Sequence, residues 1–192
     1  MIKPQEIESI FRKQLDGIGD TILREQVVAT WIDACRKGNW ASINALRKAP
    51  FTLLTDTHSI DLIAHTIAVT DGALALAKAQ MDAYAALPYE IDLDRLIAGG
   101  LLHDVGKLLE IEPDGQGGFR KSLSGKYARH PISGSILATQ NGMTEDIVNM
   151  IACHAKEGDG RPQVIETVFI HQADFATFNP LVMKQNGLLI ED

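Results

Sequence analysis

Apolar residues recur at intervals of three and four along almost the whole chain, and strict alternation of apolar and polar residues is not found. Ile7, Ile10, Phe11 and Gln14, for example, fall on one side of a helical projection. This period is that of an amphipathic α-helix, whereas a half-buried strand alternates at every second residue. The pattern therefore predicts an all-α fold.

The first 50 residues are predicted to form a helical N-terminal extension. One helix covers the apolar positions just described, a second begins near Asp20, and a shorter one covers Trp40 to Arg47. The shorter helix should stop before Pro50, because proline has a fixed φ and no backbone N–H to donate. We expect residues 1–50 to pack on the remainder of the protein.

Two helices are predicted in the middle of the chain. Residues 59–84 are rich in Ala, Leu and Ile, which favours one long helix, and His65 lies within it. The next helix should begin near residues 92–94, where carboxylates suit a helix N-terminus. This second helix carries the pair His103-Asp104 into the interior.

The following segment, 112–125, is polar and rich in glycine, which is typical of a loop. Such a loop could cover a site or could have no function. Beyond it, His130-Pro131 opens a helix that ends near Gly142, and Thr144 opens another. Short connections between these helices indicate that they are neighbours.

The C-terminal region contains one further helix with an uncertain continuation. The helix begins near Val164 and should end before Pro180. The last dozen residues allow either a short helix closed by Gly187 or a hairpin turning at Asn186-Gly187. Of these two alternatives, we expect the short helix.

Composition narrows the classes of function. The formal net charge of −7 argues against broad binding of nucleic-acid backbones, which needs clustered Lys and Arg. No apolar run approaches the roughly 20 residues that span a bilayer. The N-terminus resembles no signal peptide, so a cytoplasmic protein is expected. The two cysteines form no Cys-x-x-Cys pair and are interpreted as packing residues.

Candidate chemistry is concentrated in the histidines. His103 and Asp104 lie in Leu101-Leu-His-Asp-Val-Gly-Lys-Leu-Leu109, where potential metal ligands are embedded in an apolar helical stretch. His154 follows Ile151, Met150 and Ile147 on what should be an inward helical face. Burying such polar groups without partners is costly, and a shared cation removes that cost. The pattern indicates a metal site, although any single helical histidine is more often a structural residue.

Taken in order, the potential ligands resemble the H…HD…H…H…D pattern of the HD superfamily. The members of the pattern are His65, His103-Asp104, His130, His154 and Asp174. The resemblance is closest at Leu-Leu-His-Asp-Val-Gly-Lys, which is similar to the HDIG form of the motif, and at His130-Pro-Ile-Ser-Gly. It implies a compact multi-helix HD-domain bundle over residues 51–192, with residues 1–50 as an N-terminal extension within one structural domain.

The resemblance also implies the arrangement of the metals. His65, His103, Asp104 and Asp174 would hold one ion, and Asp104 would bridge to a second ion held by His130 and His154. Mixed nitrogen and oxygen ligands suit several divalent transition metals. We expect two ions of iron or manganese, with magnesium, cobalt, nickel and zinc as alternatives.

The function implied is a metal-dependent phosphohydrolase that cleaves a small, nucleotide-like phosphoester with a metal-activated bridging water. Asp104 would bridge the ions, and Lys107 would hold phosphate or stabilise developing charge. Lys126, Arg129 and Arg161 are further candidates for phosphate contact, although surface charge alone explains each of them.

Three other histidines and acids are weaker candidates. His58 and Asp61 precede His65 by seven and four positions, so they share its helical face if the helix starts early enough. They could then support the metal site, but a solvent-facing capping role is the alternative. His171 precedes Asp174 by three positions and could also support the site, but it is interpreted as a helix-surface residue.

Two rival functions remain open from the sequence. HD-type di-iron oxygenases resemble the same ligand set but activate dioxygen, and the Gly-Lys after His103-Asp104 favours hydrolysis over that reaction. A non-catalytic HD module that binds a ligand or a protein is the other alternative. The substrate is not specified by the pattern, and a homo-oligomer is possible through the N-terminal helices.

Overall fold

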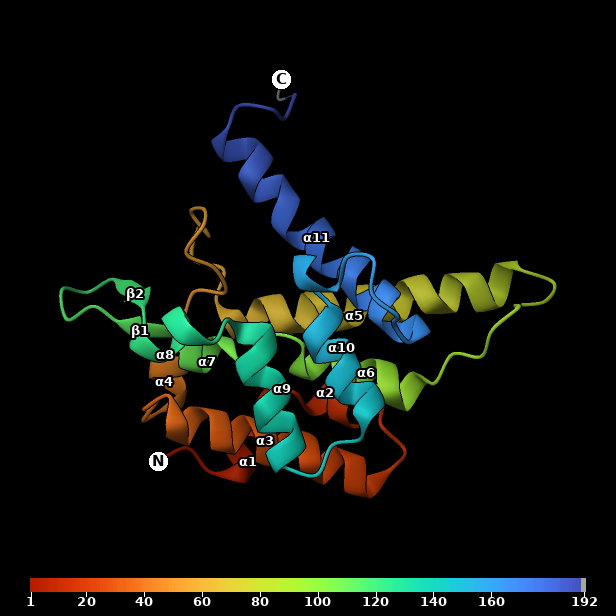
Figure 1. Cartoon of the computed structure of the whole chain (residues 1–192), viewed down its shortest axis with the longest axis horizontal. Helices are drawn as coiled ribbons and strands as arrows, with labels where there is room; N and C mark the ends of the chain where they lie inside the picture. Colours follow the sequence, from red (N-terminus) through yellow and green to blue (C-terminus); the bar gives the residue numbers. More distant parts are fainter. Residues whose placement is uncertain (191–192) are drawn as a thin grey trace.

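The computed structural model describes residues 1–190, and these residues form a helical bundle (Figure 1). The first four helices are α1 (Pro4–Ile10), α2 (Arg12–Leu15), α3 (Thr21–Lys37) and α4 (Ile43–Leu46). The central ones are α5 (Leu62–Ala83), α6 (Leu93–Leu102) and α7 (Lys107–Glu110), and they are followed by α8 (Leu123–Tyr127), α9 (His130–Gln140), α10 (Glu145–Cys153), the 3₁₀ turn η1 (Lys156–Gly158) and α11 (Ile165–Gln185). The predicted all-α class is confirmed.

The N-terminal helices pack directly on the helices that carry the His-Asp pair. The indole N–H of Trp31, in α3, donates to Leu101 O at 2.9 Å, and that of Trp40 donates to Leu108 O at 2.8 Å. Both indoles are buried, and Phe11 packs on Trp31 with ring centroids 4.9 Å apart. Since a buried indole N–H needs an acceptor, these bonds tie residues 1–50 to α6 and α7.

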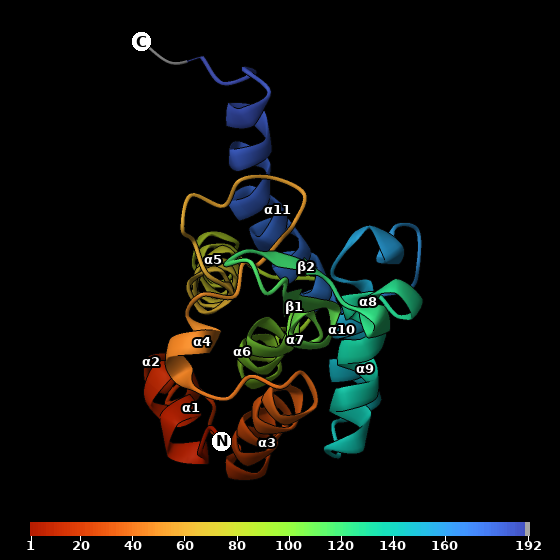
Figure 2. The same cartoon turned by 90° about the vertical axis from the view of Figure 1, so that its left-hand side faces the viewer.

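The helices α5, α6 and α11 form the centre of the bundle (Figure 2). By length and composition α5 could cross a membrane, with a mean hydropathy of 1.3 over its most apolar window. The core helix of a folded protein can be as long and as apolar as a membrane-spanning helix. In α5, 44% of this window is buried within the protein. The predicted helix start near residues 92–94 is confirmed, because the carboxylate of Asp92 accepts from Arg95 N at the start of α6.

The segment 112–125 is not only a loop. Its first part forms a hairpin in which β1 (Ile111–Pro113) pairs antiparallel with β2 (Phe119–Lys121). Asp114 closes the turn by accepting from the backbone N–H groups of Gln116 and Gly118. Strands of three residues are too short for a visible alternation of apolar and polar residues, so periodicity could not reveal them.

The prediction that the last helix ends before Pro180 is wrong. The helix α11 continues through Pro180 to Gln185, and its C-terminal half projects from the bundle (Figure 1). Proline lacks the N–H that would bond to Ala176 O, but both residues are exposed, so water can reach that carbonyl. A positive φ of 66° at Gly187 follows the end of the helix, and no hairpin forms within the described residues.

Candidate metal centre

Helices α5, α6, α9, α10 and α11 bring the six residues of the pattern together. His65 lies in α5 and Asp174 in α11, while His103 and Asp104 form the turn directly after α6. His130 is the first residue of α9, and His154 caps the end of α10. These elements are widely separated in the sequence, so the site exists only because the bundle is folded.

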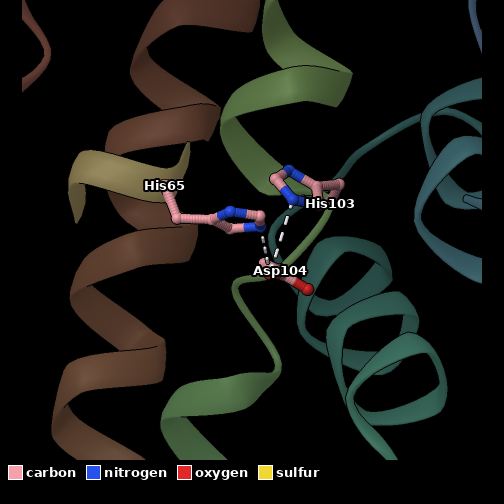
Figure 3. Close-up of side chains that lie close together, drawn as sticks. All are labelled: His65, His103 and Asp104. Carbon is pink, nitrogen blue, oxygen red and sulfur yellow. Dashed lines mark ion pairs between the residues drawn. The ribbon is translucent and has the colours of Figure 1, made fainter. Parts of the chain in front are cut away.

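Asp104 is the centre of the cluster. Its Oδ2 lies 3.2 Å from His65 Nε2 and 3.4 Å from His103 Nε2. Its Oδ1 lies 3.3 Å from His130 Nε2 and 3.5 Å from His154 Nε2. Figure 3 shows His65 and His103 pointing from different helices toward this carboxylate. The two oxygens of Asp104 therefore face two different pairs of histidines.

The potential metal ligands fall into two groups that share Asp104. One group is His65, His103 and Asp104, and the other is Asp104, His130 and His154, with the ligand atoms of each group within 4.8 Å of one another. Asp174 adds an oxygen to the first group, since its Oδ1 lies 3.2 Å from His65 Nε2. The donors match the nitrogen and oxygen ligands that divalent transition metals prefer.

The Nδ1 atoms of two histidines are held by carbonyl groups one turn earlier in the chain. His103 Nδ1 lies 2.7 Å from Gly100 O, and His154 Nδ1 lies 2.8 Å from Ile151 O. A carbonyl oxygen can only accept, so the hydrogen of each ring is on Nδ1. In the neutral ring, Nε2 then carries the lone pair that a metal needs, and it faces Asp104.

The remaining two rings are held by side chains. Glu110 Oε2 accepts from both the backbone N of His130, at 2.6 Å, and its Nδ1, at 2.8 Å. Thr177 Oγ1 donates to Asp174 O and so can accept from His65 Nδ1, 3.3 Å away. All four rings therefore use Nδ1 for support and turn Nε2 toward Asp104.

A cation at this centre would satisfy atoms that otherwise have no partner. Both carboxylate oxygens of Asp104 and the Nε2 atoms of His65, His103 and His154 are buried without a hydrogen bond. Lys107 Nζ approaches Asp104 Oδ2 to 2.7 Å as an ion pair but is not aligned as a hydrogen-bond donor. Because burying so many unpaired polar atoms is unfavourable, the residues present fit a bound divalent metal.

The charges of the centre hold Asp104 and His130 in the protonation states that bind a metal. Burial opposes ionisation of Asp104, but Lys107 and His103 outweigh it and hold the pKa of the carboxyl well below its usual range. Burial, together with the charge of Lys107, lowers the pKa of His130 to about 4. The carboxyl is therefore ionised and the imidazole neutral at neutral pH, which is the form in which each binds a metal. For His65, burial opposes protonation, but Asp104 and Asp174 outweigh it and raise the pKa of the ring.

A pocket of about 510 Å³ opens beside the centre, and Lys107, His130 and Asp174 form part of its wall. Arg129, one of the predicted phosphate contacts, also lines it and is paired with Glu157. The side chain of Lys107 is only 12% exposed, so Lys107 is not a solvated lysine at a helix end.

Four other predicted residues are not brought to the centre. Asp61 is the N-cap of α5, where its carboxylate accepts from Ala64 N. It therefore has the capping role that was the alternative to supporting the metal site. His58 precedes the helix with a positive φ of 48° and therefore does not share the helical face of His65. Lys126, on α8, and Arg161, after η1, are exposed and do not line the pocket.

Sequence reasoning missed several residues that contact the ligands. They are Glu110 and Thr177, described above, Phe51, which stacks on His65 at 4.1 Å between ring centroids, and His171, whose Nδ1 lies 2.6 Å from His154 O. Glu110 carried a signal, as an acid next to the apolar stretch that contains Asp104. His171 also carried one, as a histidine three positions before Asp174, but it was interpreted as a helix-surface residue, and the structure half-buries it against His154. The others depend on packing between distant segments.

The HD domain family matches residues 62–175, which is more than half of the chain. The chain belongs to the HD domain family. The predicted membership is thereby confirmed, and the matched range begins with α5 and ends within α11. HD domains bind divalent metals, in agreement with the buried His and Asp groups of this chain.

Similar curated proteins carry the name Ribonuclease Y. That of Pseudothermotoga lettingae is 28% identical over 173 residues, which cover 90% of this chain and 29% of the relative. That of Thermotoga petrophila is 34% identical over 91 residues, 47% of this chain and 15% of the relative. This HD protein thus spans less than a third of the length of these relatives. No solved structure gives a significant match.

Replacing Glu110 by Gln should weaken metal binding by about 10- to 100-fold, the usual effect of losing the carboxylate that supports a metal-bound histidine. Both His130 N–H groups donate to one charged oxygen of Glu110, and the neutral amide oxygen of glutamine would accept these bonds more weakly. The measurement is a competitive chelator titration with Mn²⁺. Glu112→Gln is the matched control, because within residues 1–190 Glu112 pairs with Arg120 alone, on the neighbouring strand. Equal affinities in the two variants would contradict the role given to Glu110.

Proposed function

We propose that the protein is a metal-dependent phosphohydrolase that cleaves a small, nucleotide-like phosphoester at a centre of two divalent ions. Iron and manganese are the metals proposed. The observation that carries the proposal is the position of Asp104, whose two oxygens face two separate pairs of histidines. A carboxylate placed in this way could be shared by two cations, each also held by one pair of histidines.

The residues of this chain have distinct roles in the proposed reaction. Bound divalent ions supply an activated water and neutralise charge that develops on the phosphoryl oxygens. Lys107, at the edge of the pocket and 2.7 Å from Asp104, adds a positive charge where the phosphate would lie. Glu110 and Thr177 hold the rings of His130 and His65 in position.

The relatives support hydrolysis of a phosphoester in general terms. Their name, Ribonuclease Y, denotes an enzyme that cleaves phosphodiester bonds, and the match to the Pseudothermotoga lettingae protein covers 90% of this chain and therefore most of the HD domain. Because most of each relative has no counterpart in this chain, cleavage of RNA polymers is not part of the proposal. The net charge of −7 also favours a small substrate over a long polyanion.

The test begins with protein purified without chelator. Metals per chain are measured, and phosphate release is assayed on a panel of nucleotides and other phosphoesters with added Mn²⁺ or Fe²⁺. Two metals per chain and an activity that disappears in His103→Ala would support the proposal. Absence of any bound or activating metal would refute it, and oxygen consumption without phosphate release would point to a di-iron oxygenase instead.

Lys107→Ala should lower kcat by about 100-fold while the metal content stays unchanged. A positive charge aimed at developing negative charge is typically responsible for an effect of this size in kcat. Lys126→Ala is the matched control, because Lys126 is an exposed lysine outside the pocket. Steady-state kinetics and metal analysis of the two variants give the comparison. A Lys107 variant with the kcat of the control would remove Lys107 from the mechanism.

A further inference from the structure

The pocket beside the metal centre is larger than a phosphate group requires. Its volume of about 510 Å³ lies within the range of roughly 300–1,000 Å³ found for small-molecule sites. His130 and Asp174, together with Lys107, occupy the end that adjoins the metal ligands. A phosphoester bound there would leave most of the pocket for the other part of the substrate.

Much of the remaining wall is apolar and partly aromatic. It includes Phe51, Leu53, Leu54, Phe175 and Phe178. Phe178 meets Phe51 edge to face, with ring centroids 6.5 Å apart, and Phe51 in turn stacks on the metal-site residue His65. At the outer side, Leu54 is 77% exposed. An apolar surface therefore extends from the metal site to a leucine that only a bound molecule would cover.

The two leucines belong to a segment that is held in place. This strap, residues 52–60, joins α4 to α5 and lies beside α11 in both views (Figures 1 and 2). Gln185 Oε1, on α11, accepts from Thr55 Oγ1 at 2.6 Å and from Asp56 N at 3.0 Å. Pro50 and Asp61 pair at its base. Because the strap is fixed at both its base and its middle, its apolar side chains are part of a preformed wall.

The charged side chains of the pocket are distributed unevenly. Three cations of the wall are paired: Lys107, at the metal end, with Asp104, Arg129 with Glu157, and Lys121 with Glu110. The pocket wall therefore has one cation, Lys156, without an ion pair among the described residues. This suits a ligand with few negative charges, and the apolar wall suits a ligand whose remaining part is uncharged.

We infer that this wall recognises the base of a nucleoside phosphate, with Phe178 and Leu54 as the specificity-determining residues. The inference rests on the proposed function, which places the phosphate at the metal centre. A nucleobase has flat apolar faces that stack on aromatic side chains, whereas a sugar phosphate has no comparable surface. The protein should therefore select nucleoside phosphates over sugar phosphates.

The test uses two ligands that differ only in the base. Affinities of the Mn²⁺-loaded protein for adenosine 5′-phosphate and ribose 5-phosphate are measured by titration calorimetry, and phosphate release is assayed in parallel. The nucleotide should bind about tenfold more tightly or better, the usual contribution of stacking one base. Equal affinities, or no measurable binding of either ligand, would overturn the inference.

Variants of the wall assign the selectivity to its residues. Leu54→Ala and Phe178→Leu should each reduce the preference for the nucleotide several-fold, with unchanged metal content. Phe178→Leu keeps an apolar side chain against Phe51, so the fold should be preserved. Leu76→Ala is the matched control, because Leu76 is a 43% exposed leucine on α5 outside the pocket. A preference unchanged in both wall variants would overturn the assignment.

The two proposals fail in different ways. Selective nucleotide binding without phosphate release would refute the proposed hydrolysis and support the base-binding wall. Phosphate release from both ligands, with equal affinities, would support hydrolysis and overturn the wall. The binding measurement and the activity measurement therefore separate the two conclusions.

Discussion

Asp104→Asn should lose both metals and at least about a thousandfold of the activity, the largest effect expected in this protein. The carboxylate faces both pairs of histidines, so neutralising it weakens both halves of the centre together. Asparagine has the same shape but offers one neutral oxygen, and its amide NH₂ would meet imidazole nitrogens or a cation. Metal content by elemental analysis and phosphate release give the two readouts.

The fold should survive this substitution, because charge and not volume changes. Removing a buried negative charge also leaves Lys107 without its 2.7 Å partner, so a modest loss of stability is expected. Asp114→Asn is the control for a general effect of replacing an aspartate, since Asp114 lies in the exposed hairpin turn. Full metal content in Asp104→Asn would show that Asp104 does not bridge two ions.

Gly106→Ala should destabilise the protein by about 3 kcal/mol or more and displace His130. A Cβ at residue 106 would lie 2.2 Å from His130 O and 2.6 Å from Gly134 N, both of which are backbone atoms. Overpacking typically costs about 1–3 kcal/mol when side chains can move, and here the first turn of α9 would have to shift instead. The φ of Gly106 is −64°, which suits any residue, so the backbone conformation does not require glycine here. Close packing against α9 requires it instead.

Gly72→Ala is the matched comparison for this substitution. Gly72 lies inside α5, and an added Cβ would meet its nearest neighbour, Ala173 Cβ, at an ordinary distance of 3.4 Å. Alanine favours a helix over glycine by about 0.5–1 kcal/mol, so this variant should be neutral or slightly more stable. Urea unfolding of both variants measures the difference. Equal stabilities would contradict the packing argument at Gly106.

The helices themselves could be predicted because their signals are local. The carboxylate of Asp20 caps α3 and that of Asp92 caps α6 at the positions where the sequence placed helix starts. Apolar spacing and capping depend on residues three or four positions apart, which are neighbours in any helix. Pro180 shows the limit of this reasoning, because the helix continues where exposure to water makes the lost hydrogen bond tolerable.

That the six potential ligands lie close together could also be predicted, because their order along the chain resembles that of a known family. The residues that hold the histidine rings in position could not be predicted. Glu110 reaches His130 across 20 positions, and Thr177 reaches His65 across 112. No periodicity relates such residues, since their contacts depend on how α7 meets α9 and how α5 meets α11.

The sequence by itself determined the helical class, the family and the identity of the potential metal ligands. The resemblance to that family also implied that Asp104 stands between two pairs of histidines. Only the tertiary structure decided that Lys107 is enclosed and that Phe178 and the strap form an apolar wall beside the centre. The physical reason is the separation in sequence between the residues that interact. Helix formation follows from interactions within one or two turns, whereas the geometry of a site is set by the packing of segments that are distant in the chain.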